Sequence, residues 1–375
     1  MGSKGASRCG RIQSRVAFET CSMTTRFVPA LPGRLRGRLP KIHGIWLATF
    51  ALFCVGWALQ PNSLSVSQLF NVLQVASFLG IVAIGQTLVI LTGGIDLSVS
   101  GVVTMVNIVT ALSMKGDPNR IGSTVILCLA IGLGVGIVNG ILVTKARIVP
   151  LVVTIAMQAI LFGVALLLTG GIPSGGVAKD FQYIGQGRFF GVPVAAIIWI
   201  VLTLAFAILT TRTVFGRNLY AAGSNSRAAH MSGSAVNPTV IAAYALSGLT
   251  AAIAGLIVTA YIGLPALQSG DRYQLPSVAA VAVGGTALTG GIGGVVLSAG
   301  GALFMTELGS ITNVLQVGTG ATMVIQGGAI VLGTALYSLS QRRRVPSLSP
   351  DESNASASGR KPEGGAPTAE AISDP

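Results

Sequence analysis

Long apolar blocks separated by short polar connections run along the chain from Gly44 to Tyr337. Most blocks hold about 15 to 24 residues, so that as helices they approach or match a hydrocarbon core of about 30 Å. The blocks contain almost no Lys, Arg, Asp or Glu, and a helix in lipid satisfies its own backbone hydrogen bonds. The short alternating segments of a β-barrel are absent from the sequence. The pattern therefore predicts an all-α membrane protein.

We expect a polytopic bundle of about ten transmembrane helices that includes broken helices. The block 276–288 is too short to cross a bilayer unaided. The blocks 276–288 and 293–308 therefore form either two spans or a re-entrant pair that enters and leaves on one side. Either arrangement leaves both chain ends on the same face. The predicted spans are residues 45–59, 69–91, 97–114, 122–143, 150–169, 193–211, 238–261, 276–288, 293–308 and 320–339.

Composition and charge support this class and predict its orientation. Hydrophobic residues make up 51% of the chain and charged residues only 9%, too few to cover a water-facing surface. The net charge of +13 does not indicate nucleic-acid binding, because the basic residues lie mainly in the tails and short connections. The proposed outer connections carry mixed charges, including Asp271 with Arg272, whereas the inner ones are almost free of acids. The positive-inside rule therefore predicts that both termini are cytoplasmic.

The two ends of the chain differ from the apolar middle. Residues 1–43 form a basic tail that we expect to stay in the cytoplasm, although a cleaved signal peptide is the competing interpretation. Residues 341–375 are rich in Pro, Ser, Gly and Ala, which predicts a disordered cytoplasmic tail. The four cysteines have the spacing of neither a disulfide scaffold nor a zinc site, so no metal site is expected. They are Cys9, Cys21, Cys54 and Cys128.

The first candidate for mechanism is an interruption of the apolar pattern within residues 80–101. It contains Gln86, Thr87 and, after two glycines, Asp96, which is costly to place in hydrocarbon. One interpretation is a helix-turn-helix in which Asp96, with Ser98 close behind, caps the next helix. The other is a broken helix that faces a translocation path and is sheltered from lipid. The residues alone leave both interpretations open.

Polar side chains also recur at helical spacing within predicted spans, where they share one helix face. Such stripes either join helices by hydrogen bonds or line a hydrated path for a polar solute. Glu307, inside the span 293–308, is unusual in lipid and either faces the path or lies near the outer interface. The stripes are Ser100, Thr104 and Asn107 in one span, and Thr154 and Gln158 in another.

The longest predicted cytoplasmic connection, residues 212–237, is polar yet rich in small helix-forming residues. A short helix is predicted over about residues 226–231, capped by Asn225 and closed by Gly233. Gly223 and Gly233 are expected to permit tight turns at its ends. From the residues alone, the connection either presents a compact surface to another protein or is an ordinary solvated linker.

Three segments carry recognisable signatures: residues 92–99 (TGGIDLSV), 216–233 (GRNLYAAGSNSRAAHMSG) and 278–291 (VAAVAVGGTALTGG). They resemble, in the expected order, the signature segments of ribose-type sugar permeases of ABC importers. The resemblance covers roughly residues 45–340. The sequence TGGI occurs in the first segment and again at 289–292, but Gly is so frequent here that chance explains this echo as readily as duplication.

The resemblance implies a permease domain over residues 44–340 that works with a second permease subunit, as a homodimer or heterodimer. It also implies that two ATPase subunits, or one fused ATPase, dock on the cytoplasmic loops, and that a soluble sugar-binding protein delivers the solute. A phosphate-binding GxxxxGK[ST] loop is absent from the sequence, so ATP is expected in the partner subunits and no cofactor in this chain. We expect a transport subunit surrounded by membrane lipid, not an enzyme, and no nucleic-acid partner.

By the same resemblance, the break lies near the path and residues 212–237 couple the permease to the ATPase. The family often has acidic residues where Gln274 and Pro276 stand, which leaves the substrate open. The predicted pathway residues are Gln86, Thr87, Asp96, Ser98, Ser100, Thr104, Asn107, Thr154, Gln158 and Glu307. The predicted coupling residues are Gly216, Arg217, Tyr220, Gly223, Asn225, Arg227, Ala228, Ala229, Ser232 and Gly233.

The sequence therefore predicts the inner-membrane permease subunit of an ATP-driven, binding-protein-dependent importer for a monosaccharide, ribose-like or xylose-like, or a related polar solute. An ABC permease for branched-chain amino acids or nucleosides is the alternative within the same structural class. An ion-coupled secondary transporter would need membrane-embedded ionisable groups, for which the spans offer only Asp96 and Glu307.

Overall fold

The computed structural model describes residues 43–59, 65–318, 320–329 and 331, which belong to one compact unit. Both predicted tails and the end of the predicted span 320–339 lie outside the described residues. In chain order the elements are α1 (His43–Leu59), α2 (Val66–Leu91), α3 (Val99–Met114), the 3-10 helix η2 (Pro118–Arg120), α4 (Ile121–Thr144), α5 (Pro150–Thr169), α6 (Lys179–Gln186), β1 (Arg188–Phe189), β2 (Val192–Pro193), α7 (Val194–Arg212), α8 (Val214–Ser224), α9 (Ser226–Met231), α10 (Val236–Ile262), α11 (Asp271–Val283) and α12 (Val295–Val314).

The all-α class is confirmed, since the only strands in the described part form one hairpin of two strands, each two residues long. Six described helices are long and apolar enough to cross a membrane: α2, the continuous segment of η2 and α4, α5, α7, α10 and α12. Two shorter apolar helices, α1 and α3, accompany them. Each predicted span from 45–59 to 293–308 overlaps a described helix. The number of about ten crossings remains a prediction.

Local sequence explains where several of these helices begin and end. α5 begins at Pro150, whose fixed backbone angle suits the first helical turn, and ends at Gly170 in the left-handed conformation. α2 begins after Ser65, whose hydroxyl accepts a hydrogen bond from the Gln68 N–H. α11 is only 13 residues long, as expected for a block too short to cross a bilayer, and it contains Pro276.

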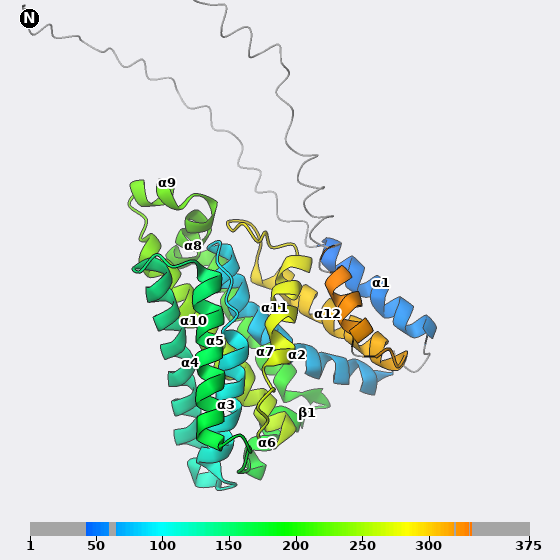
Figure 1. Cartoon of the computed structure of the whole chain (residues 1–375). Helices are drawn as coiled ribbons and strands as arrows, with labels where there is room; N and C mark the ends of the chain where they lie inside the picture. Colours follow the sequence, from blue (N-terminus) through cyan, green and yellow to red (C-terminus); the bar gives the residue numbers. More distant parts are fainter. Residues whose placement is uncertain (1–42, 60–64, 319, 330, 332–375) are drawn as a thin grey trace, which may run out of the picture. The chain divides into compact units, whose positions relative to one another are not determined.

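α2, α3 and α10 are inner helices and α4, α5 and α7 are outer ones, while α12 is intermediate. In the apolar windows of α2 and α10, 89% and 67% of residues are buried inside the protein, against 22% to 28% in α4, α5 and α7. α4 and α10 run side by side (Figure 1) because glycines on α4 leave room for the α10 backbone. A side chain at Gly136 would collide with the Tyr244 carbonyl, and one at Gly132 with the Gly248 carbonyl. Polar groups of the inner helices are therefore shielded from lipid by the outer ones.

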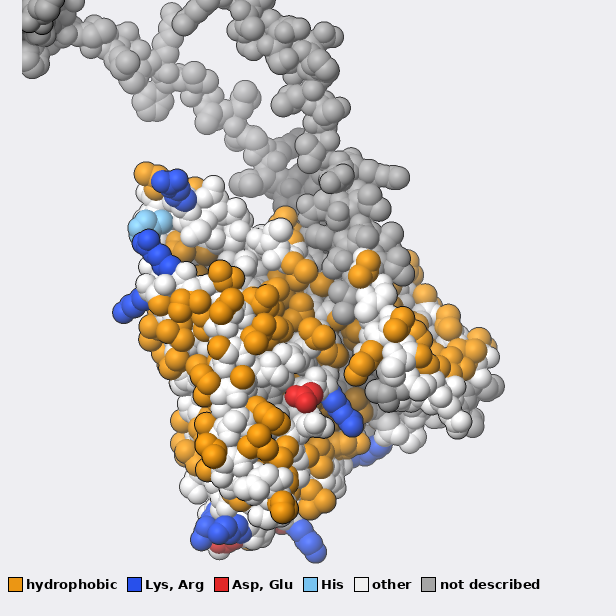
Figure 2. Space-filling model, in the orientation of Figure 1, with side chains coloured by type: hydrophobic (Ala, Val, Ile, Leu, Met, Phe, Trp, Pro, Cys, Tyr) orange, Lys and Arg blue, Asp and Glu red, His pale blue; other side chains and the backbone are white. Residues whose placement is uncertain are grey.

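The bundle has two distinct ends, and α4 runs between them. It starts at η2 and finishes beside α8 and α9, which project from the bundle (Figure 1) and define what we call the α9 end. Figure 2 shows basic side chains at both ends of one face and many hydrophobic side chains between them, interrupted near the middle by an acidic side chain with a basic one beside it. Apart from this interruption, the surface is that expected of a protein embedded in lipid.

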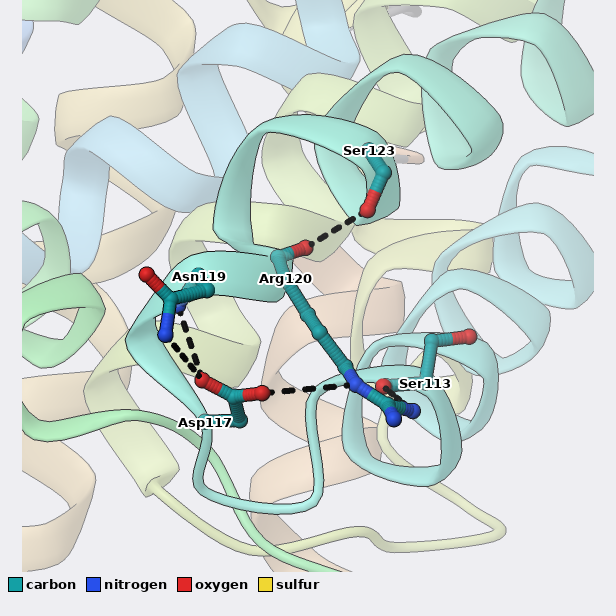
Figure 3. Close-up of polar contacts among 5 residues, drawn as sticks. All are labelled: Ser113, Asp117, Asn119, Arg120 and Ser123. Atoms are coloured by element: carbon teal, nitrogen blue, oxygen red, sulfur yellow. Dashed lines mark hydrogen bonds and ion pairs between the residues drawn. The ribbon is translucent and has the colours of Figure 1, made fainter.

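The turn at the η2 end is held by its own polar groups (Figure 3). The Asp117 carboxylate accepts hydrogen bonds from the backbone and side-chain N–H groups of Asn119, at 2.9 and 3.1 Å. Arg120 lies 3.5 Å from the same carboxylate and donates to the Ser113 carbonyl, while the Ser123 hydroxyl donates to the Arg120 carbonyl. Both charged partners are exposed, so the ion pair contributes at most about 1 kcal/mol and mainly shapes the turn.

Three features differ from the sequence-based expectations. The connection 212–237 contains a second, longer helix, α8, before the predicted short one. The connection after α5 contains the helix α6, whose Phe181 is buried. α11 starts earlier and ends earlier than the block 276–288, because the glycines at 284 and 285 end the helix and a run of turns leads to α12. In all three, the apolar pattern alone did not show where the helices begin and end.

Candidate functional site

The break between α2 and α3 is a tight turn stabilised by one glutamine. Gln86 is fully buried on α2. In the amide orientation that satisfies its neighbours, its Nε2 donates to the Asp96 carbonyl at 2.9 Å and its Oε1 accepts from the Asp96 N–H at 3.3 Å. Gln86 thus replaces the backbone partners that Asp96 loses by leaving helix geometry. Thr87, next to it, lies 2.7 Å from the Ser298 hydroxyl and joins α2 to α12.

The Asp96 carboxylate sits at the centre of a buried hydrogen-bond network. One oxygen accepts from the Ser98 N–H at 3.0 Å and the Ser98 hydroxyl at 2.6 Å, and the other accepts from the Ser247 hydroxyl at 2.8 Å. Ser98, the residue that precedes α3, also accepts from the Asn139 amide at 2.8 Å. Asp96 therefore stabilises the turn in front of α3 and ties α10 and α4 to it. The sequence analysis missed Ser247 and Asn139, whose only signal is an isolated polar residue in an apolar span.

The polar stripe on α3 binds a non-helical segment of the chain. Asn107 accepts from the Ala266 N–H at 2.6 Å and donates to the Thr259 hydroxyl at 3.0 Å and the Leu264 carbonyl at 3.4 Å. Thr104 accepts from the Gly270 N–H at 3.1 Å. We call these contacts, between the α3 stripe and residues 264–270, the polar seam. Ser100, Thr104 and Asn107 are all buried. Of the two roles predicted for such stripes, this one joins segments of the chain by hydrogen bonds.

A second polar contact joins α5 to α11. The side-chain amides of Gln158 and Gln274 face each other, with Gln274 Nε2 donating to Gln158 Oε1 at 2.6 Å and Gln158 Nε2 lying 3.4 Å from Gln274 Oε1. Both residues are half-buried. One turn earlier on α5, the Thr154 hydroxyl donates to the Ile95 carbonyl at 3.3 Å, beside the break. The predicted stripe on α5 therefore links the break to α11.

Glu307 lies apart from these networks. It is 3% exposed on α12, and a side chain on Gly56 of α1 would meet its Oε1 at 2.9 Å. Its Oε2 has no hydrogen-bond partner within the described part of the chain. Gln68 and Ser310 line the same small hollow. Glu307 therefore lies where α12 packs against α1, away from Asp96 and the polar seam.

Four glycines meet at the α9 end in what we call the glycine junction: Gly93, Gly223, Gly290 and Gly291. The Gly291 N–H donates to the Leu91 carbonyl at 3.0 Å. Gly93, Gly290 and Gly291 have φ values of 84°, 91° and 74°, which side chains rarely tolerate. The two TGGI segments, which the sequence only suggested to be related, therefore touch each other.

The role that the sequence analysis predicted for Gly223 is wrong. We expected it to form a turn, but it lies inside α8. A side chain there would collide with the Leu91 carbonyl and the Gly291 N–H, so the missing side chain permits the close approach of three backbones. Tyr220, one turn earlier, donates its hydroxyl to the Gly293 carbonyl at 2.9 Å. Burial raises the pKa of this phenol, which keeps the donor protonated.

The short helix predicted in this connection is confirmed. α9 spans Ser226–Met231, and the Asn225 side chain accepts from the Ala228 N–H at 3.0 Å. Gly233 follows with a φ of 79°. Of the predicted coupling residues, Gly216 and Ala229 are buried, Tyr220 and Gly223 are half-buried, and Arg217, Asn225, Arg227, Ala228, Ser232 and Gly233 are exposed.

A cavity of about 200 Å³ lies between α9, α10 and the break. Gly94, Ser226 and Asn237 line it, together with Tyr244, whose buried hydroxyl has no hydrogen-bond partner among the described residues. This cavity separates the exposed α9 from the Thr92–Gly94 turn on one side, while the glycine junction connects α8 to the same turn on the other. α8 therefore contacts the turn directly, whereas α9 faces it across the cavity.

Comparison with known proteins gives a consistent result. The family model described as "Branched-chain amino acid transport system / permease component" matches residues 68–334. The ribose import permease protein RbsC of Escherichia coli (strain K12) is 36% identical over 290 residues, covering 76% of this chain and 90% of that protein. RbsC of Bacillus subtilis (strain 168) is 35% identical over 301 residues, covering 78% and 91%.

A more distant relative carries a different name. The autoinducer 2 import system permease protein LsrC of Salmonella choleraesuis (strain SC-B67) is 33% identical over 294 residues, covering 78% of this chain and 83% of that protein. No solved structure matches the chain significantly.

Proposed function

This chain belongs to the family of branched-chain amino acid transport system permease components, and we propose that it carries a ribose-like or xylose-like monosaccharide, or a related polar solute, across the inner membrane. As an ABC-importer permease it is a transport component rather than an enzyme, and it works with ATPase and substrate-binding partners. The observation that carries the sugar assignment is the 36% identity over 290 residues to a ribose import permease. The named relatives do not favour the amino-acid alternative.

The finer organisation of the complex is part of the proposal. A second permease subunit, identical or related, stands beside this one, and two ATPase domains, separate or fused, bind ATP on the cytoplasmic side. The tails 1–43 and 341–375 and the α9 end face the cytoplasm, in agreement with the positive-inside rule. Residues 44–340 form the permease domain.

We further propose that α8 and α9 couple ATP hydrolysis to movement of the break. The support is geometric: α9 is exposed, with Met231 85% exposed, whereas α8 touches the Thr92–Gly94 turn through the glycine junction. A push on α9 from a docked ATPase would reach the Leu91 carbonyl through α8. The buried network of Gln86, Asp96 and Ser98 would then move as one unit.

Uptake by a reconstituted complex tests the proposed function. The affinity-tagged chain would be purified with its ATPase, placed in vesicles, and supplied with its binding protein and radiolabelled ribose, xylose or leucine. We expect sugar accumulation that requires ATP and that stops when the ATPase carries a substitution in its ATP-binding lysine. Accumulation of leucine but not sugar would contradict the sugar assignment. Accumulation of sugar by the chain without the ATPase, driven by an ion gradient, would contradict the importer mechanism.

A further inference from the structure

α11 begins partway between the two ends of the bundle. The Gly270 N–H, just before α11, is bonded to Thr104, and Gln274 is paired with Gln158. Gln158 lies near the centre of α5, about 12 Å of helix from Pro150 and about 16 Å from its other end. Because α5 is long and apolar enough to cross a membrane, the start of α11 stands at the depth of the hydrocarbon core.

Two charged residues occupy this start. Asp271 and Arg272 form the first turn of α11, within about 5 Å along the helix from Gln274. The sequence analysis placed them in an outer loop, but the hydrogen bonds of their neighbours hold them deeper. Both side chains are exposed, and neither is ion-paired within the described part of the chain, where the one ion pair joins Arg120 and Asp117. Charges at this depth are costly in lipid and are tolerated facing water or protein.

The helix α7 provides a comparison, because the exposed side chains in its middle carry no charge. Its exposed side chains at comparable positions along a membrane-crossing helix are apolar: Leu204 is 62% exposed and Val201 is 59% exposed. α7 carries no charged residue before Arg212 at its end. α7 therefore has the composition of a lipid-facing surface, and so does the exposed part of α5, whereas the start of α11 does not.

We propose that the start of α11, with the neighbouring Gln158 of α5, borders the water-filled solute path, and that Asp271, Arg272 and the Gln158–Gln274 pair contact the solute at mid-depth. This inference rests on the proposed import of a hydroxyl-rich solute and names the residues that meet it. A sugar hydroxyl both donates and accepts hydrogen bonds. The Asp271 carboxylate accepts, the Arg272 guanidinium donates, and each glutamine amide does both. The half-buried amide pair can exchange its mutual bonds for bonds to a sugar without leaving a polar group unpaired.

Water access at this depth can be measured without transport. In a chain whose native cysteines are replaced by serine or alanine, single Arg272→Cys and Leu204→Cys variants would be treated, in membranes, with a charged thiosulfonate reagent. We expect Arg272→Cys to react at least about tenfold faster than Leu204→Cys, since the reagent does not enter hydrocarbon. Equal rates would overturn the proposal, whatever the chain transports.

Solute contact is then tested in the assembled complex with its ATPase and binding protein. Ribose with ATP should slow the labelling of Arg272→Cys, and the completed modification should lower the uptake that remains in the unmodified Arg272→Cys complex by about a further tenfold or more, while leaving uptake by the Leu204→Cys complex unaffected. The charge-removing variants Asp271→Asn and Arg272→Gln, which keep the side-chain size, should each lower uptake. Fast labelling without protection by solute and without loss of uptake would show that the surface is wet but is not the path. Failure of the cysteine-free parent to import any sugar would instead count against the proposed function, because the labelling comparison is independent of it.

Discussion

The glycine junction and the polar seam solve the same problem in opposite ways. Each brings a non-helical segment into contact with a helix bundle, where unpaired backbone groups are costly. At the junction, side chains are removed so that the backbones of residues 91–93, 223–224 and 290–291 touch directly. At the seam, Thr104 and Asn107 supply side-chain partners for the backbone of residues 264–270. The junction depends on glycines that have no side chains, whereas the seam depends on the side chains of Thr104 and Asn107.

This difference separates two mechanical roles. Backbones in direct contact cannot move past one another without collision, so the junction passes a displacement from α8 to the break. Side-chain hydrogen bonds can lengthen or exchange partners, so the seam holds the segment before α11 in place while tolerating adjustment. Substitutions at the two places should therefore fail in different ways: at the junction through loss of coupling, at the seam through loss of stability.

The largest effect is expected from Gly223→Val. The new side chain would meet the Leu91 carbonyl and the Gly291 N–H, forcing α8 away from the break. We expect ATP-driven uptake and solute-stimulated ATP hydrolysis both to be abolished. Gly134→Val is the matched control, because a side chain there meets nothing within 4 Å. Should Gly223→Val prove too unstable to purify, the smaller Gly223→Ala would be measured instead. Normal coupling in a folded Gly223 variant would mean that the junction transmits nothing.

A bulky residue on α9 should uncouple the complex without affecting the fold. Ala228 is exposed, so Ala228→Trp adds volume only where the proposed ATPase surface lies. Solute-stimulated ATP hydrolysis should fall by about tenfold or more, while binding-protein docking and membrane insertion persist. The control is Gly122→Trp, an exposed site at the η2 end where a side chain meets nothing within 4 Å. If both variants hydrolyse ATP normally, α9 is only a connector.

A smaller effect, on stability, is expected at the seam. Thr104→Val keeps the shape of the side chain but leaves the buried Gly270 N–H without its partner, which costs about 1–3 kcal/mol. Thr169→Val removes a hydroxyl that bonds only within its own helix, so it should stay within about 0.5 kcal/mol of the parent. Chemical unfolding of the purified chains in detergent measures the difference. Equal midpoints would indicate that the seam is not stabilising.

The smallest effect is expected from Tyr220→Phe, which removes one hydrogen bond to the Gly293 carbonyl and costs about 1 kcal/mol. Because burial raises the pKa of Tyr220, the protonated phenol stabilises the folded state. That contribution is complete below the ordinary pKa of 10 and is lost as the pH rises through the raised value. Parent and variant should therefore differ in stability at pH 8 and converge at strongly alkaline pH. A constant difference across that range would contradict the role of this hydroxyl.

The sequence predicted elements that depend on local chemistry. The apolar blocks predicted the positions of the helices. The run from Asn225 to Gly233 predicted where α9 begins and ends, because a capping side chain and a left-handed glycine affect the backbone only within a few residues. The sequence also singled out Gln86, Asp96 and the α3 stripe as polar positions that need partners. It could not name those partners.

What the sequence did not reveal depends on contacts between distant segments. Ser247 bonds Asp96 from 151 residues away, and nothing in its neighbourhood marks it. Gly223 lies among other small residues, and only the approach of Leu91 and Gly291 distinguishes it from a turn glycine. Asp271 and Arg272 follow residues 263–270, in which Gly263, Pro265 and Gly270 indicate a surface loop. Only the bonds of Gly270 and Gln274 show that the stretch folds back into the bundle.

The polar seam also has a consequence for biosynthesis. The backbone partners of Asn107 and Thr104 follow them by 159 and 166 residues, so they are synthesised long after α3 has reached the membrane. Until then, the polar side chains of Thr104 and Asn107 lack these backbone partners. Unpaired polar groups on a helix of only 16 residues disfavour its insertion into the bilayer on its own. α3 must therefore remain in a sheltered environment, beside the insertion machinery or its neighbouring helices, until residues 264–270 arrive. Residues 264–270 thus supply hydrogen-bond partners for a helix made much earlier, and a chain truncated before residue 264 would lack them.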